Sequence, residues 1–125
     1  MFVDPRTAKD LNRAIFNAIV APRPIGWIST LSADGHVNLA PFSHFNIVST
    51  APAVVLFSCN TRADRTEKDT LANVRATGEF VYNLATLELS EAVNKTSTAA
   101  ARDVDEFELA GLQKARIFLV MKRVV

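Results

Sequence analysis

Apolar residues near the start of the chain recur every three or four positions, and this spacing predicts an amphipathic helix over about residues 7–19. The apolar positions are Ala8, Leu11, Ile15, Ala18 and Ile19. Pro22 and Pro24 end the pattern, because proline restricts the residue before it to extended conformations. The chain is therefore predicted to leave the helix before Pro22 and to continue as extended backbone.

From residue 25 onward the pattern is typical of β-strands. Residues 25–31 alternate between apolar and polar, and Ala33-Asp34-Gly35 is a turn signal before a second extended run at 37–48. Pro41 interrupts that run, and proline donates no hydrogen bond to a β-ladder, so the strand should bend, bulge or lie at a sheet edge there. The continuous apolar residues 54–57 predict a strand that is covered on both sides or closes a barrel.

The second half of the chain mixes helices with strands. Thr66-Glu67-Lys68-Asp69 has the form of a capping box, and Gly78 is placed to end the helix that follows. Residues 79–85 alternate as a strand, and Ser90 is the predicted N-cap of a short helix over 90–95. Together these elements predict a mainly β fold with accessory helices, in which antiparallel strands form a small barrel.

The composition predicts a single globular domain over residues 1–125. Hydrophobic residues make up 49% of the chain and charged residues 22%, which argues against disorder. The 14 basic and 13 acidic residues leave a net charge of +1, and no basic stripe favours nucleic acid as a partner. No apolar run approaches the roughly 18 residues of a membrane span, and the N-terminus lacks the layout of a signal peptide. We therefore expect a soluble, cytoplasmic protein.

The sequence carries no familiar catalytic or metal-binding motif. Two histidines and one cysteine give none of the usual metal-ligand spacings, and neither a glycine-rich phosphate loop nor a nucleophile elbow is present. Cys59 lies in apolar surroundings and is expected to be a small structural residue, and His44 is expected to be a hydrogen-bonded structural histidine. Any catalysis is therefore expected to depend on a bound cofactor.

Two segments carry cations that suit an anionic ligand. Lys68 and Thr70 lie at a predicted helix start, where free backbone donors and the helix dipole favour a phosphate. Asp69 would repel a phosphate unless its side chain turns away to cap the helix, and the alternative is an ordinary capped helix with a solvated lysine. Arg23 lies between two prolines, so it is either a positioned anion clamp or a solvated surface residue.

Hydroxyl and amide side chains gather on the two predicted strands around Pro41. Ser29 and Thr30 lie beside the predicted turn, where their hydroxyls either bind ligand oxygens or satisfy turn amides. Asn38 and Ser43 lie on opposite faces of a regular strand, but a kink at Pro41 would bring both toward one site. This mixture of hydroxyls, an amide and a cation among apolar residues favours a planar, phosphate-bearing ligand.

The order and spacing of several motifs resemble the flavin reductase-like family, whose fold is an FMN-binding split barrel. These motifs are Arg-Pro-Ile-Gly-Trp-Ile-Ser-Thr at 23–30, Asn-Leu-Ala-Pro-Phe-Ser at 38–43, Phe45-Asn46, Phe57-Ser58, Lys-Asp-Thr at 68–70 and Gly-Glu-Phe-Val-Tyr-Asn-Leu at 78–84. The resemblance covers about residues 5–112. It implies an antiparallel split β-barrel that is incomplete relative to the family, because members usually continue with further strands.

The resemblance also implies a cofactor, which is FMN or alternatively FAD, with NAD(P)H as the electron donor. The predicted cofactor-binding residues are Arg23, Ser29, Thr30, Asn38, Ala40, Pro41, Ser43, Lys68 and Thr70. Ser29, Thr30 and Ser43 would face the ribityl chain and the phosphate. Lys68 and Thr70 would contact the phosphate, and strand 38–43 would line the isoalloxazine edge. No side chain is expected to act as a catalytic acid or base.

Members of this family reduce flavin with NADH or NADPH, often for a monooxygenase, or act as electron-transfer flavoproteins. They are usually homodimers with flavin sites at or near the subunit interface. The resemblance therefore implies an oxidoreductase with flavin and pyridine nucleotide as small-molecule partners. Two alternatives stay open: a non-catalytic flavin-binding or electron-carrier domain, and a structural β domain without a ligand.

Residues 113–125 form an atypical tail that departs from the family pattern. Residues 97–106 before it are expected to be a loop with a partial helix, and residues 117–121 a last strand. Either a truncated or altered reading frame or a natural short variant would explain this ending. Because a barrel short of its closing strands has unpaired edges, we expect a homodimer or higher oligomer in which the partner covers the tail or an edge.

Overall fold

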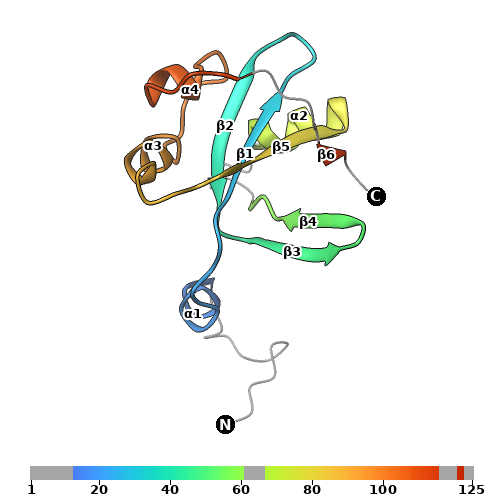
Figure 1. Cartoon of the computed structure of the whole chain (residues 1–125). Helices are drawn as coiled ribbons and strands as arrows, with labels where there is room; N and C mark the ends of the chain where they lie inside the picture. Colours follow the sequence, from blue (N-terminus) through green and yellow to red (C-terminus); the bar gives the residue numbers. More distant parts are fainter. Residues whose placement is uncertain (1–12, 61–66, 116–120, 123–125) are drawn as a thin grey trace.

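An antiparallel sheet with the strand order β2-β1-β5-β6 lies at the centre of the molecule (Figure 1). The structure is a computed structural model, and it describes residues 13–60, 67–115 and 121–122. The strands of the sheet are β1 (Gly26–Leu31), β2 (Val37–Phe42), β5 (Glu79–Leu84) and the short β6 (Met121–Lys122). A hairpin of β3 (Phe45–Thr50) and β4 (Ala53–Phe57) forms a second, two-stranded sheet.

Helices are added around these strands in the described part of the chain. They are α1 (Arg13–Ile19), α2 (Asp69–Thr77), α3 (Ser90–Lys95) and α4 (Glu106–Leu109). α2 packs against β1, β2 and β5, and α4 packs against β2 (Figure 1). All strand pairs are antiparallel within these ranges, which confirms the predicted mainly β fold with accessory helices.

The two ends of the chain test the predictions only in part. The opening helix is confirmed over 13–19, and residues 7–12 of its predicted range lie outside the described residues. The predicted last strand at 117–121 also lies mostly outside them. Met121 and Lys122 do pair with Phe80 and Glu79 of β5, so a short strand is present at its end.

β2 continues through Pro41 without a break in its pairing, and Pro41 lies on the edge strand of the central sheet. Pro41 is paired with Trp27 of β1 in an unbroken register, and β2 is the last strand in the sheet order on that side. Proline is tolerated at an edge, where its missing N–H removes no ladder bond. The edge position is therefore confirmed, but the single extended run over 37–48 is wrong. The chain bends at Ser43 and His44 and continues as β3 in the second sheet.

The end of α2 agrees with the prediction, whereas its start does not. Gly78 has a φ of 74° and its N–H donates to the Val74 oxygen at 2.9 Å, so it ends the helix in the left-handed conformation. Lys68, not Thr66, is the N-cap, and its side chain makes no cap bond because an ammonium group has no acceptor. Thr66 lies outside the described residues.

Of the two later helices, α3 starts without a side-chain cap and α4 starts with one. Leu89, rather than the predicted Ser90, is the N-cap of α3, because a backbone turn in which Leu89 N–H donates to Thr86 at 3.2 Å leads into the helix. α4 starts with a side-chain cap, since Asp105 accepts the amides of Phe107 and Glu108. The predicted loop with a partial helix over 97–106 is thus confirmed, and α4 begins at its last residue.

The core lies between the central sheet, α2 and the β3–β4 hairpin. Its buried apolar residues are Ile28, Phe42, Phe45, Val74 and Phe80. The Phe57 ring of β4 joins the hairpin to this core, with its centroid 5.1 Å from those of Phe42 and Phe80. Leu56 beside it is 50% exposed, so the prediction of a strand covered on both sides at 54–57 is wrong. Among the described residues, β4 pairs with β3 alone.

Candidate functional site

A hollow of about 450 Å³ opens between the edge strand β2, the start of α2 and the segment that follows α3. We call it the β2–α2 hollow. Its volume lies in the range of about 300–1,000 Å³ that is typical of small-molecule sites. Its lining residues come from separate parts of the chain: Asn38, Ala40, Pro41, Lys68, Asp69, Thr70, Thr96, Ser97, Thr98, Ala99, Ala100 and Glu106.

Buried polar side chains fasten α2 to the strands beside the hollow. Asn38 Nδ2 donates to Thr70 Oγ1 at 2.9 Å, and Asn73 Nδ2, one turn along the helix, donates to Thr30 Oγ1 at 3.0 Å. Thr70 is 1% exposed, so these bonds lie in surroundings where an unpaired polar group would be costly. They fix the first turn of α2 relative to β1 and β2.

Positive charge and backbone donors gather where α2 begins. The backbone oxygen of Lys68 accepts the amides of Leu71 and Ala72 at 2.9 and 3.0 Å, and the earlier amides precede this first helical bond. The positive end of the helix dipole lies at the same place. Lys68 lines the hollow, and its Nζ lies 5.2 Å from the centroid of the buried Phe42 ring in a cation–π contact. The start of α2 therefore offers a cation, helix amides and the Thr70 hydroxyl to an anion.

Glu106 closes the hollow from the side of α4, and the sequence analysis missed it. Its Oε2 accepts the backbone amide of Leu39 at 3.1 Å, which satisfies an amide of the edge strand. Burial raises the pKa of this carboxyl, and the nearby acids Asp69 and Asp105 act in the same direction. The local signal that could have indicated α4 is Asp105, whose side chain caps the helix.

Thr96 holds the segment after α3 against the central sheet. Its Oγ1 accepts the indole N–H of Trp27 at 2.9 Å and donates to the Val93 oxygen at 3.0 Å. Trp27 is buried, and a buried indole N–H needs an acceptor. The need for such an acceptor was the signal for a contact here, but nothing in the sequence identified Thr96 as the partner.

Ser29 and Thr30 lie away from the β2–α2 hollow. They border a second cavity of about 480 Å³, between β1, β5 and residues 113–115. Asn83 Nδ2 donates to Ser29 Oγ at 3.1 Å, while Thr30 Oγ1 accepts from Asn73. Adjacent residues of a strand point to opposite faces, so the two hydroxyls bind different amides of the protein instead of meeting.

Ser43 and Arg23 are also outside the lining of the hollow. Ser43 lies at the bend between β2 and β3, and the β1–β2 register is unbroken at Pro41, so no bulge there brings Ser43 toward Asn38. Arg23 Nη1 donates to the backbone oxygens of Asn17 at 2.8 Å and Val20 at 3.2 Å, so it binds the end of α1. The predicted residues that the fold does bring together at the hollow are Asn38, Ala40, Pro41, Lys68 and Thr70.

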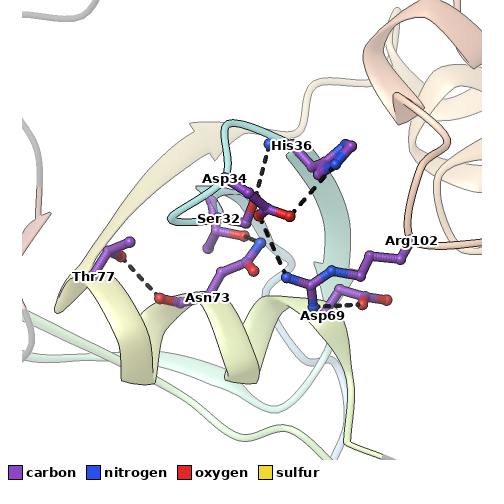
Figure 2. A network of polar contacts seen from close by, with 8 residues as sticks. Ser32, Asp34, His36, Asp69, Asn73, Thr77 and Arg102 are labelled. Carbon is purple, nitrogen blue, oxygen red and sulfur yellow. Dashed lines mark hydrogen bonds and ion pairs between the residues drawn. The ribbon is translucent and has the colours of Figure 1, made fainter.

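An ionic network borders the hollow on the side of Asp69 (Figure 2). Arg102 Nη1 lies 3.8 Å from Asp69 Oδ1, and Arg102 Nη2 lies 3.7 Å from Asp34 Oδ1 in the β1–β2 turn. His36 Nε2 lies 3.6 Å from the other oxygen of Asp34, and the His36 amide donates to Ser32 Oγ at 2.8 Å. A hydrogen bond from Ser32 is the main cause that lowers the pKa of Asp34, so this carboxylate is ionised at neutral pH.

The surroundings of His44 and Cys59 indicate structural and not catalytic residues. His44 Nε2 lies 3.3 Å from Asn17 Oδ1, and its Nδ1 lies 3.2 Å from Asn60 Nδ2, which confirms the predicted hydrogen-bonded histidine. Burial raises the pKa of the Cys59 thiol to about 11, although the Lys68 ammonium acts in the opposite direction. The thiol is therefore protonated at neutral pH and is a poor nucleophile.

Metal-binding clusters and membrane-spanning helices are both absent from the described residues. No three side chains of the types His, Cys, Asp or Glu are grouped there to hold a metal ion. The helices in the same ranges lack the length and apolar character that a membrane crossing needs.

Known proteins match this chain over the same region that forms the hollow. The sequence model described as flavin reductase like domain matches residues 20–120. The chain belongs to the flavin reductase-like family. This match confirms the resemblance inferred from the motifs, and it includes every residue that lines the β2–α2 hollow.

Solved structures of flavin reductase-like proteins share the fold. Nitrilotriacetate monooxygenase component B from Bacillus cereus is 27% identical, with a TM-score of 0.76 over 89% of this chain and 55% of that chain. A protein from Shewanella frigidimarina NCIMB 400, described as a flavin reductase with a split barrel domain, is 21% identical, with a TM-score of 0.72 over 94% of this chain and 59% of that chain. The predicted split barrel is thereby confirmed.

The sequence of this member of the flavin reductase-like family covers only part of the proteins it matches. An uncharacterized protein of Aquifex aeolicus (strain VF5) is 45% identical over 111 residues, which are 89% of this chain and 57% of that protein. The chain thus spans little more than half the length of its relatives.

Proposed function

We propose that this chain binds FMN in the β2–α2 hollow, with the phosphate at the start of α2, and that it is an oxidoreductase that takes electrons from NAD(P)H. One observation carries the proposal: Lys68 and the first turn of α2 border a hollow of ligand size in a member of the flavin reductase-like family. An ammonium group, helix amides and the helix dipole together match a dianionic phosphate. FMN is favoured over FAD because its phosphate is terminal and can reach a helix start directly.

Thr70 is the hydroxyl that we assign to the phosphate. It accepts a hydrogen bond from Asn38, and a hydroxyl that accepts in this way still has its own hydrogen to donate. The buried bond to Asn38 fixes the Thr70 oxygen, so little ordering of this side chain would be needed when a ligand binds. Asn38 is therefore proposed to act through Thr70.

The β2 side of the hollow is proposed to receive the isoalloxazine ring. Ala40 and Pro41 present small apolar groups there, and an edge strand has backbone groups that no neighbouring strand pairs. When bound, the flavin supplies the hydride chemistry. The residues of the chain would bind and orient it and limit the access of water, and none needs to act as an acid or base.

We further infer that this chain forms a homodimer and that it supplies reduced flavin to a partner protein. The β3–β4 hairpin exposes apolar side chains, Ile47 and Val48 among them, as a subunit interface requires. Nitrilotriacetate monooxygenase component B is among the structures that this chain resembles, and its name supports an oxygenase as the partner.

The visible spectrum tests the proposed function. Purified protein is mixed with excess FMN and passed through a desalting column, and FMN alone is treated in the same way as the control. We expect the flavin bands to stay with the protein and to bleach when NADH or NADPH is added without oxygen. Retained bands that do not bleach would favour the alternative of a flavin-binding or electron-carrier domain. A colourless protein would contradict the proposal.

A further inference from the structure

We propose that Arg102 is a positioning residue, which makes the start of α2 receptive to a phosphate by neutralising Asp69. This inference rests on the proposed function, because it concerns the same hollow. Arg102 lies outside the lining of the hollow, and it belongs to the segment between α3 and α4. No motif in the sequence indicates such a role.

Asp69 places a negative charge where the phosphate is proposed to bind. Asp69 is the first residue of α2, lies between Lys68 and Thr70, and lines the hollow with them. Its side chain is 20% exposed, so water screens its charge only in part. The Asp69 carboxylate opposes the attraction that the Lys68 ammonium and the helix dipole exert on a phosphate, and the ion pair with Arg102 reduces that opposition.

The guanidinium of Arg102 lies between two carboxylates, those of Asp69 and Asp34 (Figure 2). Nη1 lies 3.8 Å from Asp69 Oδ1, and Nη2 lies 3.7 Å from Asp34 Oδ1 in the β1–β2 turn. Asp34 is also approached by His36 and accepts from Ser32, so it is itself fixed. The second carboxylate therefore orients Arg102 toward Asp69 without adding charge to the hollow.

Arg102 also ties down one wall of the hollow. Residues 97–100 line the hollow, and Arg102 lies two positions after the last of them. The ion pairs of Arg102 with Asp69 of α2 and with Asp34 in the β1–β2 turn hold the segment after α3 close to β1 and β2. Neutralisation of Asp69 and support of the wall are distinct mechanisms, and we assign the first to Arg102.

A double-mutant cycle on FMN affinity separates these mechanisms. Dissociation constants are measured by quenching of flavin fluorescence for the wild type, Arg102→Gln, Asp69→Asn and the double variant. If Arg102 acts by neutralising Asp69, Arg102→Gln weakens FMN binding about threefold to tenfold at low salt, and less at high salt. In the Asp69→Asn background the same substitution should change FMN affinity less than about twofold.

Matched measurements show that the effect is specific. Arg75→Gln removes a different exposed arginine, which lies on α2, pairs with Glu67 and does not line the hollow. This variant should leave FMN affinity unchanged. Riboflavin, which lacks the phosphate, should bind wild type and Arg102→Gln equally. Arg102→Lys keeps the positive charge and should retain most of the FMN affinity, and thermal melts check that every variant is folded.

Three results would overturn the proposal. If wild type binds FMN and Arg102→Gln binds it equally well, Arg102 has no role. If Arg102→Gln weakens FMN binding to the same extent in the Asp69→Asn background, Arg102 acts on the wall or on the ligand and not through Asp69. If wild type binds no FMN, the proposed function fails first, and the role of Arg102 fails with it.

Discussion

Glu106 is a carboxyl group in a position where its charge is poorly hydrated. Only 8% of the residue is exposed, and burial is the main cause that raises its pKa above that of an ordinary glutamate. The folded protein therefore holds this proton more tightly than the unfolded chain does. The stabilisation that results is fully present below the unfolded pKa of about 4.3, and it is lost as the pH rises through the folded pKa.

Glu106→Gln should show this dependence on pH. Glutamine keeps an oxygen that can accept the Leu39 amide, but it carries no charge. We expect the free energy of unfolding of the wild type, relative to this variant, to fall as the pH rises from about 4 to 7. Urea denaturation of both proteins at several pH values measures the difference. A difference that stays constant, or that grows with pH, would show that burial does not penalise the ionised form.

The sequence could identify some residues of the hollow because they carry local signals. Lys68 and Thr70 lie at a helix start, and Asn38 lies in a strand motif with its own spacing. Glu106 had no such signal, because its partner Leu39 is 67 positions away. Ser29 is predicted to bind the cofactor, and its hydroxyl accepts from Asn83, 54 positions later, a contact that no local pattern indicates. Contacts of this kind arise from the fold and not from neighbouring residues.

Among the elements, β1 and the start of β3 approach so closely that only glycine fits at one position. A Cβ atom on Gly26 would lie 2.3 Å from Phe45 Cδ2 and 2.6 Å from Phe45 Cγ. The Phe45 ring is buried and stacks on Tyr82 with centroids 4.9 Å apart, so it has little room to move. The contact fixes the hairpin to the central sheet near the bend that follows β2.

Gly26→Ala should therefore destabilise the protein. Overpacking of this kind costs roughly 1–3 kcal/mol, which urea denaturation can measure. Gly35→Asn is the comparison, because a Cβ atom there would meet nothing within 4 Å and only the strain of the φ of 91° remains, so a smaller loss is expected. An alanine variant at Gly26 with wild-type stability would contradict the close packing of β1 on β3.

The elements were easier to predict than their ends. The alternation at 25–31 and 79–85 gave β1 and β5, because both strands have the period of a sheet. The start of α2 was misjudged at Thr66, because a capping-box pattern does not by itself decide which residue becomes the N-cap. The bend at Ser43 and His44 carried no proline or glycine signal, so the division of 37–48 between two sheets could not be seen.

For the molecule as a whole, the exposed hairpin is the surface that should be covered in a homodimer. Ile47 and Val48 on β3 are 62% and 60% exposed. Ile47→Lys should weaken self-association, as measured by size-exclusion chromatography with light scattering at micromolar concentration. Leu87→Lys is the control, because Leu87 is 85% exposed but lies in the loop before α3. A monomeric wild type, or equal effects of both substitutions, would contradict an interface at the hairpin.

The class of the fold could be predicted because several weak patterns agreed with one another. Strand periods, the turn at 33–35 and motif order all indicated an antiparallel barrel, and the family match confirms the assignment. No comparable pattern indicates whether the predicted cofactor residues come together in one site. Whether hydroxyls on neighbouring strand positions share a site depends on side-chain directions and on competing amides, as Ser29 and Thr30 demonstrate.

The most direct test of the central claim compares FMN with riboflavin. The phosphate is the only difference between them, so the ratio of their affinities isolates the contribution of the phosphate site. We predict that the wild type binds FMN more tightly than riboflavin, and that Lys68→Ala weakens FMN binding about tenfold or more while leaving riboflavin unchanged. Lys95→Ala, an exposed lysine at the end of α3, should alter neither. Equal loss for both flavins, or no loss for FMN, would contradict a phosphate at the start of α2.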